Sequence, residues 1–300
     1  MKHFLTLKDC SKKDIINLLN TADQLKSEQK NNIPHKILEG KTLGMIFSQV
    51  STRTRVSFEV GMYQLGGMAM FLPSDALQIT KGEPVPDTAR VLSRFLDAVM
   101  IRTKSQSELE EYASHSEIPV INGLTDLWHP CQAIADLMTV RERKISFKGL
   151  KISYIGMGNN NANSLISGCI KLGVKIDVAC PVGFSPTDEI INAGLESGLL
   201  TFSHNPRDAV SGADVVYAGK WHTLDEVYDE EERRRAFEGY TLDCDLISLA
   251  KENVLVLHSL PAHRGMEISD EVLEAHADDI FTQTENRLHA QKAILANLMR

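Results

Sequence analysis

The sequence has few cysteines, and their placement excludes the usual patterns of metal binding and disulfide bonding. Five cysteines are present, an odd number, and they are scattered along the chain as Cys10, Cys131, Cys169, Cys180 and Cys244. None of them lies in a Cys-x-x-Cys pair or at zinc-ligand spacing from a histidine. We therefore expect no metal site, no disulfide framework and a reducing cytoplasmic environment.

The chain also lacks a surplus of positive charge and any long hydrophobic run. Its 32 Lys and Arg against 40 Asp and Glu leave a formal net charge of −8, which argues against general binding to nucleic acid or to anionic membranes. No segment approaches the roughly 18 apolar residues that suggest a transmembrane helix, and the first ten residues do not resemble a signal peptide. These absences predict a soluble protein in which any anionic ligand needs a local cationic pocket.

Short β-branched runs alternate with longer segments of helical periodicity. Buried strands are expected at 42–48, 97–103, 118–124, 150–158, 174–181, 213–219 and 253–261. Segments such as 12–28 and 87–96 have apolar residues recurring at three and four positions, which is typical of amphipathic helices. This alternation predicts an α/β protein whose parallel sheets are flanked by helices.

A polar and basic interruption, "RERKISFKG", separates two such sets of segments at residues 141–149. We expect one domain over residues 1–140 and a second over 141–285, both of ordinary domain size. The chain then continues through a short strand-like run, "DDIFTQT", into an amphipathic helix over about 286–300. This apolar helix is expected to pack back on the first domain.

The stretch "SQVSTRTRVSFEVG", residues 48–61, combines two arginines and three hydroxyls with the start of a helix. Backbone N–H groups in the first turn of a helix, together with its dipole, favour an anion. An arginine fork and hydroxyl donors are what a phosphate group requires. The alternative is that Ser51 only caps the helix and that Arg53 and Arg55 are solvated, but two cations at a helix start are unfavourable without an anion.

Two further motifs place polar groups at the ends of structural elements. His129 of "HPCQ" precedes a proline at a helix entrance and could donate a hydrogen bond to a carbonyl oxygen, or be an ordinary loop histidine. Cys131 in the same motif is expected to be a small buried residue without a nucleophilic role. The motif "HSLPAHRG", residues 258–265, ends an apolar strand, where ligands of parallel sheets collect, although a simple turn explains it equally well.

The glycine-rich turn "GMGNNNANS", residues 156–164, does not support dinucleotide binding. Asn161 stands where the third glycine of the GxGxxG pattern is expected, and Asp177 falls inside its strand rather than after it. The asparagines suit the lining of a small-molecule site better. The run "DEEERRRAF", residues 229–237, is interpreted as a solvated helical face.

These motifs together resemble the aspartate/ornithine carbamoyltransferase family over nearly the whole chain. "STRTR" with "SFE", "DTARVLSR", "HPCQ", "HSLPAHRG" and "ENRLHAQKA" occur in the order and approximate spacing of that family. "HPCQ" and "ENRLHAQKA" are similar to the ornithine branch. The resemblance implies two α/β domains, carbamoyl phosphate as donor, a homotrimer with shared active sites and no cofactor or metal.

The resemblance also implies roles for particular residues. The carbamoyl phosphate site would comprise Ser51, Thr52, Arg53, Thr54, Gln78, Arg102, His129, Gln132, Leu260 and Arg287, with Gln78 and less certainly Lys81 supplied by a neighbouring subunit. Among these, the catalytic groups would be Arg53, Arg102, His129, Gln132 and Arg287. The acceptor would meet Asn160, Lys220, Thr223, Leu224, Asp225 and Ser259.

Such a site matches the chemistry of carbamoyl transfer. A neutral amine attacks the carbonyl carbon of a mixed anhydride, an oxyanion develops and phosphate departs. Cations on the phosphate and hydrogen-bond donors at the oxyanion stabilise this transition state, and the two substrates must be held in line.

The sequence departs from the family pattern around the amino-acid loop. The ornithine pattern "TDxWxSMG" appears as "AGKWHTLD", residues 218–225, so that Gly219 replaces an aspartate and Lys220 follows it. Ser48, Gln49, Met157 and Ser259 are further departures from the family. Ornithine, yielding citrulline, is the first hypothesis for the acceptor. Putrescine, an acylated ornithine or another amino acid is the second, and a catalytically silent binding or regulatory relative is the third.

Overall fold

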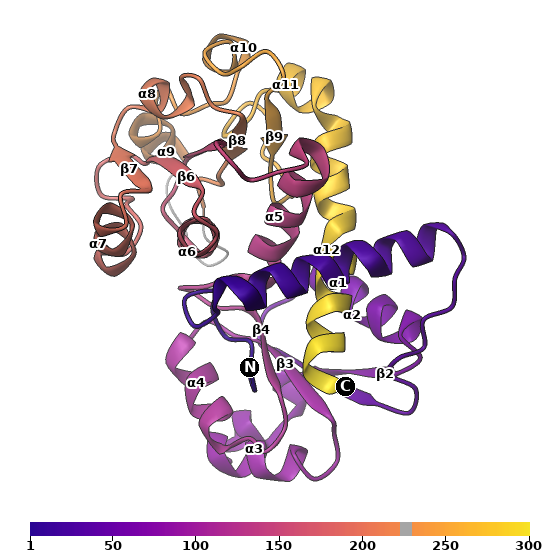
Figure 1. The fold of residues 1–300 in the computed structure, drawn as a ribbon. Coiled ribbons are helices and arrows are strands. Elements are labelled where there is room, and N and C mark those ends of the chain that lie inside the picture. Colours follow the sequence, from indigo (N-terminus) through magenta and orange to yellow (C-terminus); the bar gives the residue numbers. More distant parts are fainter. Residues whose placement is uncertain (223–229) are drawn as a thin grey trace. The chain divides into compact units, whose positions relative to one another are not determined.

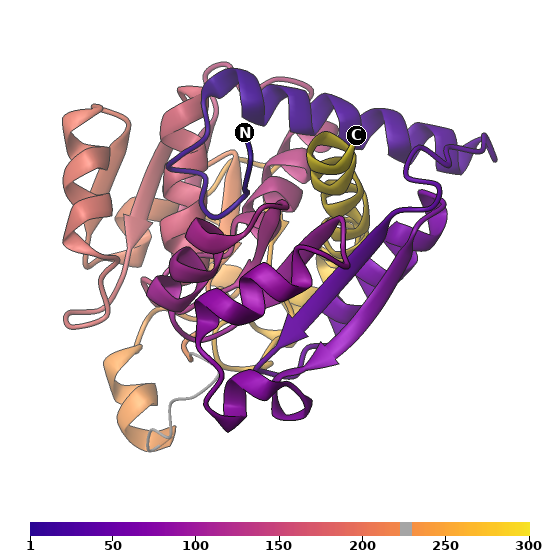
Figure 2. The same cartoon turned by 90° about the horizontal axis from the view of Figure 1, so that it is seen from below.

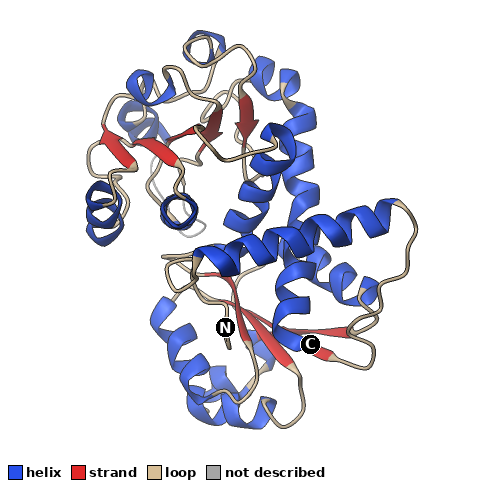
Figure 3. Cartoon of the chain, viewed as in Figure 1, coloured by secondary structure: helices blue, strands red, loops and turns tan. Residues whose placement is uncertain are grey.

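The computed structural model describes residues 1–222 and 230–300. It contains two compact units, unit 1 comprising Met1–Ala135 with Arg287–Arg300 and unit 2 comprising Asp136–Asn286. Each unit is built around its own parallel sheet, which Figure 3 distinguishes from the surrounding helices. The predicted α/β class with two helix-flanked parallel sheets is thereby confirmed.

Unit 1 has a four-stranded sheet in the order β2-β1-β3-β4 (Figure 1). Its strands are β1 (Thr42–Phe47), β2 (Met68–Pro73), β3 (Ala98–Arg102) and β4 (Val120–Leu124). Around and between them lie α1 (Lys12–Lys30), α2 (Thr52–Gln64), η1 (Ser74–Ala76), η2 (Gln78–Lys81), α3 (Val85–Leu92), α4 (Gln106–His115) and the first residues of α5 (Pro130–Lys144). The chain order reverses between β1 and β3, and such a switch point is where an open parallel sheet binds its ligand.

Burial explains which strands of unit 1 the sequence predicts. The residues of β3 are all buried and those of β1 nearly so, and such strands appear as continuous apolar runs. The edge strand β2 was not predicted, because its residues are only partly buried and its short run, "MAMFLP", follows directly on a helix. Its register with β1 is parallel, with Met45 opposite Phe71, and Figure 2 shows the two strands side by side.

Unit 2 has a five-stranded parallel sheet in the order β7-β6-β5-β8-β9. Its strands are β5 (Lys151–Ile155), β6 (Lys175–Ala179), β7 (Leu200–Ser203), β8 (Val215–Ala218) and β9 (Leu255–Leu257). Its helices are α6 (Asn160–Leu172), α7 (Asp188–Glu196), α8 (Pro206–Val210), α9 (Glu230–Ala236), α10 (Cys244–Ile247), α11 (Asp270–Ala275), most of α5 and the first part of α12 (Ala277–Met299). The switch point of this sheet lies between β5 and β8.

The strand-like reading of "DDIFTQT" is wrong, because these residues lie inside α12. Ile280, Gln283 and Asn286 are completely buried, and this spacing of three is helical rather than strand-like. Polar partners on α5 explain why amides occupy the buried face. Gln283 donates to Asp136 at 2.6 Å, and Asn286 donates to Thr139 at 3.0 Å.

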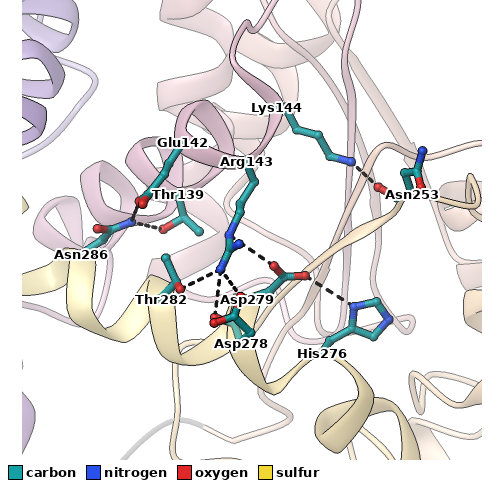
Figure 4. A network of polar contacts seen from close by, with 10 residues as sticks. All are labelled: Thr139, Glu142, Arg143, Lys144, Asn253, His276, Asp278, Asp279, Thr282 and Asn286. Carbon is teal, nitrogen blue, oxygen red and sulfur yellow. Dashed lines mark hydrogen bonds and ion pairs between the residues drawn. The ribbon is translucent and has the colours of Figure 1, made fainter.

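Exposed ion pairs continue this contact between α5 and α12 within unit 2 (Figure 4). Arg143 lies 2.6 Å from Asp278 and 3.4 Å from Asp279, and it also donates to Thr282. Lys144 donates to the carbonyl of Asn253. Part of the basic segment predicted as a domain boundary therefore stabilises the packing of two helices.

The last part of α12 packs on unit 1, as predicted. Figures 1 and 2 show it beside α1, and a hydrogen bond of 3.1 Å joins Lys292 to Gln29. A side chain at Gly61 of α2 would contact Lys292, Leu288 and Leu295. No helix in the described part of the chain is long and apolar enough to cross a membrane.

Candidate functional site

The first turn of α2 is the centre of the candidate site in unit 1. Ser51 is the N-cap, in extended backbone conformation, and its hydroxyl accepts a hydrogen bond from the backbone N–H of Thr54. The capping proposed as the alternative is therefore present. The arginines are not both solvated, however, since Arg53 is half-buried and burial lowers the pKa of its guanidinium.

Arg55 differs from Arg53 in having nearby partners of its own. It is exposed, its Nε donates to Glu59 at 2.9 Å, and its guanidinium lies 3.9 Å from the centre of the Phe71 ring. This agrees with a structural role for Arg55. Arg53 is then the cation of the "STRTR" segment that an anion at the helix start would meet.

Arg287 joins three segments of the candidate site. Its Nη2 donates to the hydroxyl of Thr54 at 2.9 Å and its Nη1 donates to the Gln132 side chain at 3.0 Å. All three side chains are at most 5 % exposed. The segments "STRTR", "HPCQ" and "ENRLH" thus meet through one guanidinium, although Thr54 and Arg287 are 233 residues apart in the chain.

Arg102 and His129 are buried, with 4 % and 5 % exposure. Arg102 is the last residue of β3 and lies opposite Phe47 of β1, and its carbonyl accepts hydrogen bonds from the backbone and hydroxyl of Ser48. It therefore lies at the carboxyl edge of the sheet, beside the strand that leads into α2. His129 immediately precedes α5, and its carbonyl accepts from the N–H of Gln132.

The remaining predicted residues of unit 1 are exposed. Thr52 lies in the first turn of α2, while Gln78 and Lys81 lie on η2.

Cys131 is buried, and its thiol donates to the carbonyl of Asn122. Burial raises the pKa of this thiol to about 12. A thiol in this state is a poor nucleophile, in agreement with the predicted packing role.

Unit 2 gathers its predicted residues at the carboxyl edge of its sheet. Lys220 follows β8, and its ammonium donates to the carbonyl of Leu260, after β9, at 3.0 Å. Ser259 accepts a hydrogen bond of 3.2 Å from Asn161. The predicted Asn160 lies beside Asn161 in the chain, at the start of α6. Thr223, Leu224 and Asp225 lie outside the described residues.

A buried histidine positions the strand-end motif of unit 2. The N–H of Leu260 donates to Nδ1 of His258 at 2.9 Å, so Nε2 carries the proton and donates to Glu267 at 3.1 Å. Burial lowers the pKa of His258 despite this carboxylate. Leu260 itself has a φ of 45°, a conformation uncommon outside glycine. The His258–Glu267 pair was not singled out from the sequence, because only the turn between them brings them together.

Tyr154 occupies the space beside Gly219. A Cβ atom at Gly219 would lie 2.3 Å from the Tyr154 hydroxyl, and that hydroxyl donates to the carbonyl of Met157. Tyr154 is fully buried. The aspartate of the ornithine pattern therefore cannot be accommodated at position 219 in this packing, so Gly219 and Tyr154 are a matched pair.

Two family models match this chain. The aspartate/ornithine carbamoyltransferase carbamoyl-P binding domain matches residues 2–142, and the Asp/Orn binding domain of the same family matches residues 148–298. The chain belongs to the aspartate/ornithine carbamoyltransferase family. Its recognition from the sequence is confirmed.

Relatives of full length support the same assignment. The chain is 46 % identical over 302 residues to an ornithine carbamoyltransferase of Geobacter sulfurreducens, covering 100 % of both chains. It is 48 % identical over 300 residues to that of Pelobacter propionicus, covering 99 % and 98 %.

Solved structures agree with the fold. Ornithine carbamoyltransferase from Pyrococcus furiosus has a TM-score of 0.95 at 45 % identity, with 99 % and 97 % coverage. The anabolic ornithine carbamoyltransferase from Campylobacter jejuni has a TM-score of 0.92 at 40 % identity, with 99 % coverage of both chains.

No group of three His, Cys, Asp or Glu side chains within residues 1–222 and 230–300 could hold a metal ion. The chemistry offered by unit 1 is instead that of fixed cations and neutral donors around a helix start.

Proposed function

We propose that this protein transfers the carbamoyl group of carbamoyl phosphate to the amino group of an amino acid, with ornithine as first acceptor. The observation that carries the proposal is the buried Arg287, which joins Thr54 in the first turn of α2 to Gln132 beside His129. Full-length relationship to ornithine carbamoyltransferases at 46–48 % identity supports the same activity.

In the proposed reaction, the phosphate of carbamoyl phosphate binds at the start of α2. Backbone N–H groups, the hydroxyls of Ser51 and Thr52, and the guanidinium groups of Arg53 and Arg102 would hold it. The amine nitrogen then forms a bond to the carbonyl carbon, the bond from that carbon to the phosphate oxygen breaks, and the proton lost by the amine is taken up by the departing phosphate. The cations stabilise the departing phosphate.

The developing oxyanion needs donors that are in place before the reaction. His129, Arg287 and Thr54 are the proposed donors, because all three are buried and two of them are hydrogen-bonded together. Gln132 positions Arg287 through their 3.0 Å hydrogen bond. Donors fixed in this way need no reorganisation as the charge develops. The reaction as proposed needs no metal, cofactor or cysteine nucleophile.

The acceptor is proposed to bind at the carboxyl edge of the unit 2 sheet. Asn160, Ser259 and Lys220 would contact it, together with Thr223, Leu224 and Asp225. Lys220 supplies a positive charge at this edge, which suits the carboxylate of an amino acid better than the second ammonium of a diamine.

A different acceptor is the second candidate, and one packing observation favours it. Tyr154 excludes a side chain at Gly219, so this chain holds no acid at the position that would pair with the α-ammonium of ornithine. An acceptor whose α-nitrogen is acylated needs no such partner. This alternative leaves the proposed chemistry unchanged.

One experiment decides between these acceptors. The purified protein is incubated with carbamoyl phosphate and, separately, ornithine, an Nα-acylated ornithine, putrescine and other amino acids, and ureido product and phosphate are measured. Highest kcat/KM with ornithine supports the first acceptor, and another preferred amine supports the second. Carbamoyl phosphate binding without transfer to any amine would contradict the proposed activity and indicate a binding relative.

A homotrimer in the cytoplasm is the proposed state of the protein. Gln78 on the exposed turn η2 would complete the site of a neighbouring subunit, with Lys81 as its less certain companion. No disulfide joins the five cysteines, all of which lie within the described residues, and this is consistent with a reducing compartment.

A further inference from the structure

Lys292 is a buried lysine in unit 1 that takes no direct part in the proposed reaction. Its residue exposure is 0 %, and its ammonium hydrogen-bonds three side chains. These are Oε1 of Gln29 at 3.1 Å, Nε2 of His35 at 2.7 Å and Oε1 of Gln64 at 2.8 Å. An ammonium has three N–H donors, so this set of acceptors uses all of them.

The protonation state of His35 follows from its contacts. Its Nε2 must accept from the ammonium of Lys292, so the ring proton is on Nδ1, which lies 3.0 Å from the carbonyl of Ile33. Glu28 lies 3.6 Å from the same Nδ1 and is the carboxylate that faces this cluster from α1. The cluster is complete only when Lys292 is charged and His35 is neutral.

The same helix that carries Lys292 also carries Arg287, and both contact α2. Arg287 donates to Thr54 in the first turn of α2, and Lys292 donates to Gln64, its last residue. The alkyl chain of Lys292 passes over Gly61, where a Cβ atom would lie 3.3 Å from Cγ of Lys292. Helix α12 thus holds α2 at both ends.

We propose that Lys292 is a positioning residue for carbamoyl phosphate. By forming hydrogen bonds with Gln64, His35 and Gln29, Lys292 holds the phosphate-binding helix α2 in a fixed position relative to Arg287. This inference rests on the proposed function. Lys292 does not touch the substrate. It acts through α2, because a helix fixed at its last residue presents the N–H groups and hydroxyls of its first turn in one orientation.

The proposal has a consequence in alkaline solution. Burial lowers the pKa of Lys292 to about 8. The neutral amine has only two N–H donors, so one of its three contacts loses its hydrogen bond above that pH. We expect the affinity for carbamoyl phosphate to fall by about 2- to 30-fold across this step, the range typical of coupling through packed elements.

Protein stability should change in the opposite direction. Between the folded pKa of about 8 and the ordinary value of 10.5, the unfolded chain binds a proton that the folded chain releases, so the free energy of unfolding rises with pH. A lysine that only stabilised the fold would leave the affinity for carbamoyl phosphate unchanged across this step, because stability does not fall there. Opposite changes therefore distinguish positioning from general stabilisation.

The test measures carbamoyl phosphate binding by calorimetry from pH 7 to 9.5, together with the free energy of unfolding. Lys292→Met should weaken binding at pH 7 and abolish the alkaline step. Lys292→Arg, which stays charged throughout this range, should bind without an alkaline step even if the methionine variant fails to fold. Lys30→Met, an exposed neighbour of Gln29 on α1, is the control and should keep the wild-type profile.

Two results would overturn the proposal. One is a Lys292→Met protein with wild-type affinity and the wild-type alkaline step, and the other is an unchanged step in Lys292→Arg. Failure of the proposed carbamoyl phosphate site gives a different result, because wild-type protein would then bind no carbamoyl phosphate at any pH, whereas failure of the transfer reaction alone would leave this binding test unaffected.

Discussion

At the scale of single residues, the candidate site combines arginines with neutral hydrogen-bonding groups. Arg287 donates to the hydroxyl of Thr54 and to the side-chain amide of Gln132. Arg53 is half-buried, and the partial desolvation of its guanidinium costs free energy. An arriving phosphate offsets this cost by pairing with the guanidinium. The site is therefore prepared for an anion in a way that an exposed arginine such as Arg55 is not.

The two neighbouring arginines of α2 provide a matched test. Arg53→Ala should reduce kcat/KM by about 100- to 1000-fold, the usual effect of removing a donor that stabilises transition-state charge. Arg55→Ala removes an exposed pair with Glu59 and a ring contact, and should reduce activity far less. Steady-state kinetics and circular dichroism of both variants check this. Near-normal turnover by a folded Arg53→Ala protein would show that the phosphate binds elsewhere.

Lys220 allows a second prediction at this scale. Lys220→Gln should raise KM for ornithine by about 10- to 100-fold, the loss of one charge-assisted hydrogen bond to a carboxylate. Putrescine has no carboxylate, so its kinetics should change little or improve. Lys175→Gln, at the exposed opposite end of the sheet, is the control. Equal effects on both acceptors would contradict recognition of a carboxylate by Lys220.

At the scale of secondary-structure elements, contacts between neighbouring elements restrict which residues each loop can contain. Tyr154 of β5 packs against Gly219, which directly follows β8. In unit 2 these two strands are neighbours in the sheet, so a side chain on one limits the residue allowed after the other. In this packing Tyr154 restricts position 219 to a residue without a side chain.

A double-mutant cycle measures this coupling. Gly219→Ala should lower the free energy of unfolding by about 1–3 kcal/mol, because its methyl group would overlap the Tyr154 ring. The same substitution should cost less in a Tyr154→Leu background, where the ring is absent. Urea unfolding of the four proteins gives the coupling energy. Simple additivity of the two single effects would show that the side chains do not compete for space.

At the scale of the whole molecule, the proposed trimer makes a prediction that the isolated chain does not. Gln78 is exposed on η2, whereas Arg53 lies at the start of α2. If one subunit supplies Gln78 to the site of its neighbour, an assembly of two inactive variants contains some intact sites.

Complementation is therefore the appropriate measurement. Arg53→Ala and Gln78→Ala are purified separately, mixed under conditions that exchange subunits, and assayed. Random mixing should restore up to about a quarter of the wild-type activity. The reason is that an intact site needs one unmodified residue from each of two adjacent subunits of a closed oligomer, and each is present in half of the subunits. Mixing Arg53→Ala with Arg102→Ala, both proposed for the same subunit's site, should restore none. Equal recovery in both mixtures would contradict a shared site.

Much of the fold could be predicted from local patterns. The apolar runs of β1, β3, β4 and four of the strands of the second sheet, β5, β6, β8 and β9, are visible because parallel strands are buried on both faces. The edge strand β2, whose apolar run is only partly buried, and the four-residue edge strand β7, "LTFS", are not expected from the sequence. The segment 278–284 is helical rather than strand-like, and the partner of its buried amide Gln283 is Asp136 on α5, 147 residues away, which local patterns do not show.

The sequence by itself determined the α/β class and the family, and it led to the proposal that residues 51–55 bind phosphate, because each rests on residues close together in the chain. Only the tertiary structure decided that Arg287 joins Thr54 to Gln132, that Tyr154 excludes a side chain at Gly219, and that the buried Lys292 has three side-chain partners. The physical reason is the same in each case. Hydrogen bonding, steric exclusion and desolvation act between atoms that are near in space, and these residues are far apart in sequence.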